Sequence, residues 1–139
     1  MQFTIHADGG ARGNPGPAGA GAVIRDELGT IIGSVSKFLG HQTNNFAEYE
    51  AVIAALEELF TLVPAGKRAA TQVVVKMDSE LVVKQMNREY KVKHPNLKAQ
   101  HARLIQLAGA FTSVSFVHVP REQNSDADQL ANDAMDRGA

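Results

Sequence analysis

The stretch that sets the architecture is Gln2-Phe3-Thr4-Ile5-His6-Ala7-Asp8-Gly9-Gly10, close to the start of a 139-residue chain. Phe3, Ile5 and Ala7 alternate with polar residues, and this period of two predicts a β-strand with one buried face. The strand is expected to end at Asp8, because the two glycines that follow are typical of a turn. A carboxylate at the end of a strand is therefore the first candidate functional group in the chain.

Outward from this strand, two further strands are expected at residues 21–25 and 31–39, joined by a hairpin loop. Apolar residues then recur at helical spacing from Tyr49 to Val63, after capping residues at positions 43–45. The rest of the chain predicts a strand at Gln72–Met77, helices at 80–88 and 97–110, a strand at 114–119 and a last helix that includes Ala127 to Met135.

The resulting order is β-β-β-α-β-α-α-β-α. Early consecutive strands favour antiparallel hairpins, whereas later strand–helix–strand units favour parallel additions. We therefore expect an α/β fold in one domain over residues 1–139. Its centre would be a mixed five-stranded sheet, with three antiparallel strands and then two parallel strands, flanked by helices.

The composition is that of a globular protein, with 44% hydrophobic and 21% charged residues and a formal net charge of −1. No segment approaches the roughly 20 apolar residues of a membrane helix, and the first residues do not resemble a secretory signal. The chain has no cysteine, which excludes disulfides and thiolate metal ligands. A cytoplasmic monomer without membrane association is expected.

Basic residues are concentrated in one segment, where a single acid, Glu89, accompanies Lys84, Arg88, Lys91, Lys93, Lys98 and Arg103. A nucleic-acid enzyme needs only a local basic surface, not an overall positive charge. A solvated helix face explains the same pattern equally well. Both interpretations of this segment remain open.

Four acids fall at the boundaries of predicted elements. Asp8 and Asp78 end the first and fourth strands, and Glu48 and Asp128 lie in the first turns of the first and last helices. In an α/β sheet the carboxyl ends of parallel strands and the starts of the following helices open at one edge. If the first and fourth strands are parallel neighbours, Asp8 and Asp78 lie side by side.

Each acid also has a purely structural explanation. Asp8 suits a turn before glycine, and Asp78 suits a helix cap. Glu48 with Asn45 and Asp128 with Ser125 have the spacing of capping pairs.

Together the four acids are better explained by chemistry. Four carboxylates at one edge repel one another strongly unless cations neutralise them. Carboxylate oxygens with water suit Mg²⁺ or Mn²⁺. The reaction that such a site favours is two-metal phosphoryl transfer.

Four stretches of the chain resemble the motifs of type 1 ribonuclease H: DGGARGNPGPAG at 8–19, TNNFAE at 43–48, MDS at 77–79 and HVPREQNSDADQLA at 118–131. They occur in the family's order and span nearly the whole chain. Better-known bacterial members carry a basic insertion rich in tryptophan and lysine after the third motif. This chain has no tryptophan and resembles the compact archaeal-type and actinobacterial members.

The resemblance implies a ribonuclease H-like fold and a hydrolase, an endonuclease that cuts the RNA strand of RNA–DNA hybrids. The products would carry 5′-phosphate and 3′-hydroxyl ends. Asp8, Glu48, Asp78 and Asp128 are implied as catalytic residues and as ligands of two divalent cations, Mg²⁺ with Mn²⁺ as a possible substitute. An RNA–DNA hybrid is the expected partner.

The resemblance also carries substrate contacts onto Gly9, Asn14, Thr43 and Asn45. Glycine lets a backbone approach nucleic acid closely, and a short amide can hydrogen-bond sugar hydroxyls or base edges. The contact expected from position 80 is in doubt, because relatives often have glutamine where this chain has Glu80. An acid near phosphates is unfavourable unless it faces away.

The resemblance leaves two candidates for the catalytic loop. His118 lies ten residues before Asp128, where many relatives have a histidine that can move protons. Arg121 is the other candidate, because an arginine is proposed to take the role of the catalytic loop in archaeal-type relatives.

Two other functions are alternatives. Another nuclease of the ribonuclease H-like superfamily would share the acids but not the other residues of the second and fourth motifs. A catalytically inactive hybrid-binding module is not supported by the sequence, because all four carboxylates are present.

Overall fold

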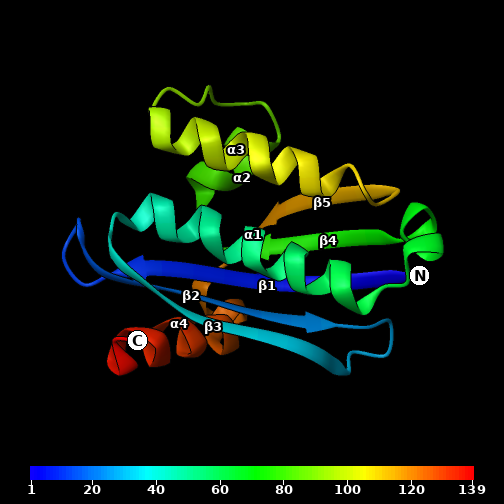
Figure 1. Cartoon of the computed structure of the whole chain (residues 1–139), viewed down its shortest axis with the longest axis horizontal. Coiled ribbons are helices and arrows are strands. Elements are labelled where there is room, and N and C mark those ends of the chain that lie inside the picture. Colours follow the sequence, from blue (N-terminus) through cyan, green and yellow to red (C-terminus); the bar gives the residue numbers. More distant parts are fainter.

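A mixed sheet of five strands forms the centre of the computed structural model, which describes all 139 residues (Figure 1). The strands are β1 Gln2–Ala11, β2 Gly16–Arg25, β3 Ile31–Gln42, β4 Gln72–Met77 and β5 Ser113–His118. They lie in the order β3-β2-β1-β4-β5. The first three pair antiparallel, whereas β4 joins β1 and β5 joins β4 in parallel. The predicted mixed sheet is confirmed.

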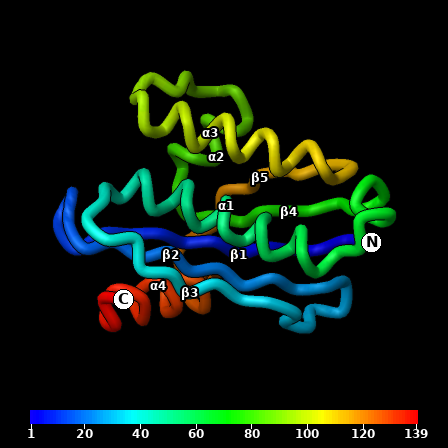
Figure 2. The backbone as a smooth tube through the Cα atoms, in the orientation of Figure 1, coloured from blue at the N-terminus to red at the C-terminus, as the bar shows by residue number.

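Helices cover both faces of this sheet. They are α1 Asn44–Leu62, α2 Glu80–Met86, α3 Pro95–Ala108 and α4 Ser125–Arg137, with short 3₁₀-helices η1 Ala65–Ala70 and η2 Arg121–Asn124. One face of β1–β3 packs against α1, on which α3 lies, and the other face packs against α4 (Figures 1 and 2). None of the helices combines the length and the apolar character that crossing a bilayer requires. The two 3₁₀-helices were not predicted, because so few residues carry no periodic signal.

The main core lies between α1 and the sheet. Phe3, Ile5 and Ala7, the alternating residues of β1, are all buried in it, as their period predicts. Tyr49 of α1 is fully buried, and its hydroxyl donates a hydrogen bond to Oε1 of Gln85 in α2 at 2.6 Å. A buried hydroxyl needs such a partner, so this bond fixes α2 against α1.

Two glycines let helices lie directly on the central strands. A Cβ on Gly9 of β1 would overlap the carbonyl of Ala47 and lie 2.5 Å from the backbone nitrogen of Glu48 in α1. A Cβ on Gly21 of β2 would overlap the carbonyl oxygen of Ala127 and lie 2.5 Å from the backbone nitrogen of Ala131 in α4. Both helices are therefore held at backbone distance from the sheet.

The expectation that Asp8 ends the first strand is wrong. β1 continues to Ala11, because residues 8–11 stay paired with residues 21–18 of β2. The second strand accordingly begins at Gly16 instead of residue 21. Glycine and proline are depleted in strands, which is why the glycine- and proline-rich segment after Asp8 predicts a turn. Asp8 lies inside a central strand.

The first helix begins at Asn44, so Glu48 lies beyond the first turn in which it was predicted. Its cap is Thr43, whose Oγ1 accepts a hydrogen bond from the backbone nitrogen of Phe46 at 3.2 Å. The capping pair of Asn45 with Glu48 is therefore not formed.

The structural explanations of two other acids also fail. Ser79, not Asp78, caps α2, and its Oγ accepts from the backbone nitrogen of Val82 at 3.3 Å. Asp128 lies in the first turn of α4 as predicted, but this helix has no side-chain cap and Ser125 is its first residue. None of these acids is used to start a helix.

We predict that Gly21→Ala destabilises the fold, because the added methyl group must push α4 away from β2. Overpacking of this kind costs about 1–3 kcal/mol in the free energy of unfolding, which denaturant titration measures. Gly66→Ala is the matched control, since nothing lies within 4 Å of the position its Cβ would take. Equal stabilities of the two variants would contradict close packing of α4 on β2.

Candidate active site

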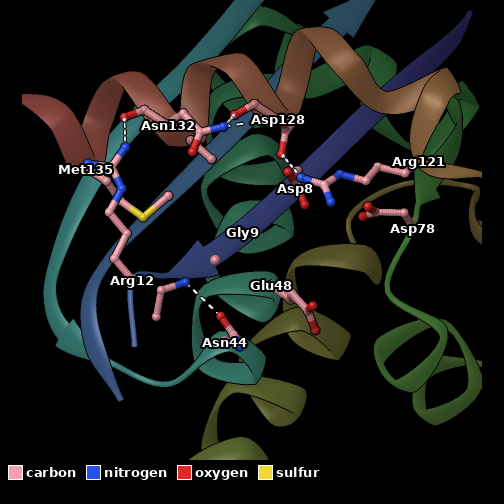
Figure 3. Close-up of a pocket in the computed structure, with 13 residues that line it drawn as sticks. Asp8, Gly9, Arg12, Asn44, Glu48, Asp78, Arg121, Asp128, Asn132 and Met135 are labelled. Atoms are coloured by element: carbon pink, nitrogen blue, oxygen red, sulfur yellow. Dashed lines mark hydrogen bonds and ion pairs between the residues drawn. The ribbon is translucent and has the colours of Figure 1, made fainter. Parts of the chain in front are cut away.

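The four predicted acids line one pocket of about 310 Å³ (Figure 3). They come from four different elements: Asp8 from β1, Glu48 from α1, Asp78 from the residue after β4, and Asp128 from α4. Residues that share the pocket with them include Gly9, Gly10, Ala11, Arg12, Asn44, Arg121 and Asn132. The fold thus brings together acids that lie far apart in the sequence.

The sheet register explains how the first two acids meet. β1 and β4 are parallel neighbours, and Ala7 is paired with Met77. The next residues, Asp8 within β1 and Asp78 just after β4, therefore lie at the same level of the sheet. Glu48 joins them because α1 is packed at backbone distance against Gly9, and α4 carries Asp128 across Gly21 of β2 in the same way.

Asp8 is the acid whose negative charge is least favourable in the folded protein. It is only 8% exposed, and its pKa is raised to about 8 by this burial, by hydrogen bonding to Asp128 and by the negative charge of Asp78. Burial disfavours a charged carboxylate, and like charges nearby add to the cost. The pocket therefore favours anything that supplies positive charge to Asp8.

Glu48 shows the same effect in a weaker form. Burial raises its pKa to about 7, the hydroxyl of Ser79 opposes the rise, and the charge of Asp78 adds to it. Ser79 Oγ donates to Oε2 of Glu48 at 2.6 Å while it caps α2. One serine therefore fixes both the carboxylate and the start of the helix that follows Asp78.

Asp128 is the acid with a cationic neighbour. Arg121 Nη2 lies 3.6 Å from its Oδ1, and Asn132 Nδ2 donates to its Oδ2 at 3.2 Å (Figure 3). His118, the rival of Arg121, does not line the pocket; it is exposed at the end of β5. Of the two candidates for the catalytic loop, the geometry brings only Arg121 to the acids.

The four predicted substrate residues are divided between two pockets. Gly9 lies in the pocket of the acids, whereas Asn14, Thr43 and Asn45 line a neighbouring pocket of about 300 Å³. Other residues of this second pocket are Gln42, Phe46, His94, Asn96 and Leu97.

One residue connects the two pockets. The backbone nitrogen of Asn44 donates to Oδ1 of Asn14 at 3.1 Å, and its own Oδ1 accepts from the backbone nitrogen of Ala11 at 2.7 Å. The β1–β2 turn and the start of α1 are therefore joined between the pockets. Sequence reasoning missed Asn44, although it belongs to the second motif.

Asn124 is a second residue that sequence reasoning missed. It is 1% exposed, and its Nδ2 donates to the carbonyl oxygen of Ala7 at 2.7 Å. This bond ties η2, which carries Arg121, to the strand position before Asp8. Its place in the fourth motif was the available signal.

The basic segment is partly neutralised. Lys84 pairs with Glu80 at 2.7 Å and Arg103 with Glu57 at 3.5 Å. A third pocket is lined by Arg88, Lys91 and Lys98, which have no such partner, and by His101. The ion pair with Lys84 also offsets the negative charge of Glu80, the residue whose contact with the substrate was in doubt.

The acids do not form a ready-made ligand cage. No three histidine, cysteine, aspartate or glutamate side chains are grouped to hold one metal ion. Glu48 is bonded to Ser79, and Asp128 to Asn132 and Arg121. The donor set nevertheless consists of carboxylate oxygens alone, which suits hard divalent cations.

We predict that Asp8→Asn raises the melting temperature at pH 8 in EDTA. The folded protein holds the Asp8 proton up to a pKa of about 8, whereas the unfolded chain releases it near 3.8, so stability falls as pH rises between these values. The neutral amide removes this loss, and the gain disappears below pH 4. Glu122→Gln, at an exposed acid, is the control. A wild-type melting temperature independent of pH over this range would contradict the burial cost.

The comparisons with known proteins agree with this geometry. Residues 6–134 match the family described as Reverse transcriptase-like. The bifunctional protein Rv2228c of Mycobacterium tuberculosis is 46% identical over 140 residues, which cover 100% of this chain and 37% of that protein. The chain thus spans little more than a third of this relative. Ribonuclease H of Aromatoleum aromaticum is 34% identical, with 97% of this chain and 91% of the relative covered.

A solved structure gives the same result. LC11-RNase H1 in complex with an RNA/DNA hybrid superposes with a TM-score of 0.91 at 48% identity, and 97% of each chain is covered. Sheet order, extent of the match and identity all agree, and the chain belongs to the type 1 ribonuclease H family.

Proposed function

We propose that this chain is an endoribonuclease that hydrolyses the RNA strand of RNA–DNA hybrids. The observation that carries the proposal is the convergence of four carboxylates in one pocket, with the pKa of Asp8 raised to about 8 and that of Glu48 to about 7. The similar LC11-RNase H1 has been solved with a hybrid bound, which supports this substrate. The products would carry 5′-phosphate and 3′-hydroxyl ends.

Two divalent cations are proposed as cofactors, Mg²⁺ with Mn²⁺ as a possible substitute. Asp8, Glu48, Asp78 and Asp128 would hold them, because these four carboxylates supply only hard oxygen ligands and burial disfavours the charge of Asp8 and Glu48. When bound, the two ions would supply activation of a water molecule and stabilisation of the leaving oxygen of a phosphodiester.

Residues in and around the pocket orient the acids. Ser79 fixes Glu48 through a 2.6 Å bond, and Asn132 fixes Asp128 through a 3.2 Å bond. Arg121 stands beside Asp128 and can offset negative charge that develops on the cleaved phosphate. Asn124 keeps the turn that carries Arg121 attached to β1.

Recognition of the hybrid is assigned to the second pocket and to the turn beside it. Asn14, Thr43 and Asn45 present amides and a hydroxyl there. RNA differs from DNA by its 2′-hydroxyls, which a wide minor groove exposes to such groups. Gly9 of β1 lines the neighbouring pocket of the acids.

Digestion of an end-labelled hybrid tests the function. The wild-type chain with Mg²⁺ or Mn²⁺ should cut the RNA strand far faster than either strand of a DNA duplex of the same sequence.

We predict that Asp78→Asn abolishes this cleavage but keeps binding of the hybrid, because it removes a charge without changing the bulk of the side chain. Titration of labelled hybrid measures the binding. Full activity of Asp78→Asn would remove this residue from the site, and equal cleavage of hybrid and DNA duplex would overturn the proposed substrate.

We predict that Arg121→Ala slows turnover more than His118→Ala, because only Arg121 lines the pocket of the acids. Loss of a charge-stabilising group costs about 10-fold or more in kcat, whereas His118→Ala should change kcat by less than about 3-fold. Both residues are exposed, so both variants should keep the wild-type melting temperature. A larger loss for His118→Ala would assign the catalytic loop to the histidine instead.

A further inference from the structure

The pocket of the acids has a basic end that the proposed chemistry does not use. In Figure 3 the carboxylates lie toward one side, Arg12 lies toward the other, and Gly9 and Asn44 lie between them. Arg12 follows β1 directly and lies in the turn before β2. Resting on the proposed function, we propose that Arg12 binds a phosphate of the RNA strand beside the cleavage point.

The guanidinium of Arg12 is held in place with donors to spare. Its Nη2 lies 2.6 Å from Oδ1 of Asp136 and donates to the carbonyl oxygen of Asn132 at 3.5 Å. Nε and Nη1 have no hydrogen-bond partner in the chain, and the side chain is 48% exposed. A guanidinium fixed on one side and free on the other is well suited to bind a phosphate.

The floor between Arg12 and the acids is open. Gly10 carries no side chain, and a Cβ there would come no closer than 4.0 Å to its nearest neighbour, Oδ1 of Asn44. Asp8 and Arg12 are four residues apart on an extended backbone, at most about 13 Å along the strand. A polynucleotide strand crossing this floor would have more than one phosphate over the pocket.

The position of Arg12 in the same pocket as the acids identifies the strand that it contacts. The strand that passes the four carboxylates is the one that is cut, which is the RNA strand under the proposed function. The other cation of the pocket, Arg121, lies within 3.6 Å of Asp128 at the acidic end. Arg12 is thus the basic side chain available to the next phosphates of the same strand.

A purely structural role makes a different prediction. If Arg12 served only to attach the β1–β2 turn to α4, its ion pair with Asp136 would be its function. Both partners of this pair are about half exposed or more, and such pairs add little to stability. Loss of either partner should then have the same small effect.

The test compares Arg12→Ala, Arg12→Lys and Asp136→Asn with the wild type on an RNA–DNA hybrid. For Arg12→Ala we expect KM to rise about 5-fold, kcat to stay within about 2-fold, and the slope of log affinity against log salt to fall by about 1, as for one lost phosphate contact. Arg12→Lys should recover part of the affinity. Asp136→Asn should leave KM unchanged, because it keeps the guanidinium.

A second measurement identifies the strand. Single uncharged methylphosphonate linkages are placed in turn near the cut, either in the RNA strand or in the DNA strand. One RNA position should remove the difference in affinity between wild type and Arg12→Ala, whereas no DNA position should do so. An unchanged KM and salt slope in Arg12→Ala, equal effects of Arg12→Ala and Asp136→Asn, or an effect confined to DNA positions would overturn the proposal. If the wild type leaves the hybrid intact, the proposed function itself fails, which is a distinct result.

Discussion

Contact between backbones, without intervening side chains, is the constraint on which the rest of this structure depends. Gly9 admits the backbone of α1 to β1, and Gly21 admits the backbone of α4 to β2. The two helices approach opposite faces of adjacent strands, so each carries one acid to the same region. Interdigitated side chains of ordinary size would hold these helices farther from the sheet. The position of Glu48 and Asp128 relative to Asp8 therefore depends on the absence of side chains at Gly9 and Gly21.

The same arrangement has an electrostatic cost. Asp8 is buried beside two other carboxylates, and the rise of its pKa to about 8 measures how poorly the fold tolerates its charge. Ser79, Asn132 and Arg121 relieve Glu48 and Asp128 in part, but no cationic side chain pairs with Asp8. Strongly shifted pKa values of this kind cluster at functional sites, where proteins retain interactions that are unfavourable for stability.

Much of this could be predicted from the sequence, and the failures have physical causes. The alternation in β1, the helical period of α1 and the order of elements are local patterns, and the structure has all three. The extent of β1 and β2 was missed because glycine and proline are poor strand formers, while pairing across the hairpin overrides that tendency at residues 8–11 and 16–21. Asn44, Asn124 and Arg12 gain their places in the site from contacts across 30 or more residues, which no local pattern records.

The hydrogen bond from Asn124 to Ala7 joins residues 117 positions apart. It has a consequence for biosynthesis. A ribosome completes the first strand long before it makes η2 and α4, and until then Asp8 has neither this clamp nor Asp128 beside it. A nascent polypeptide that ends before η2 lacks one of the four acids and one wall of the pocket. The pocket of the acids is therefore completed only after α4 has emerged from the exit tunnel.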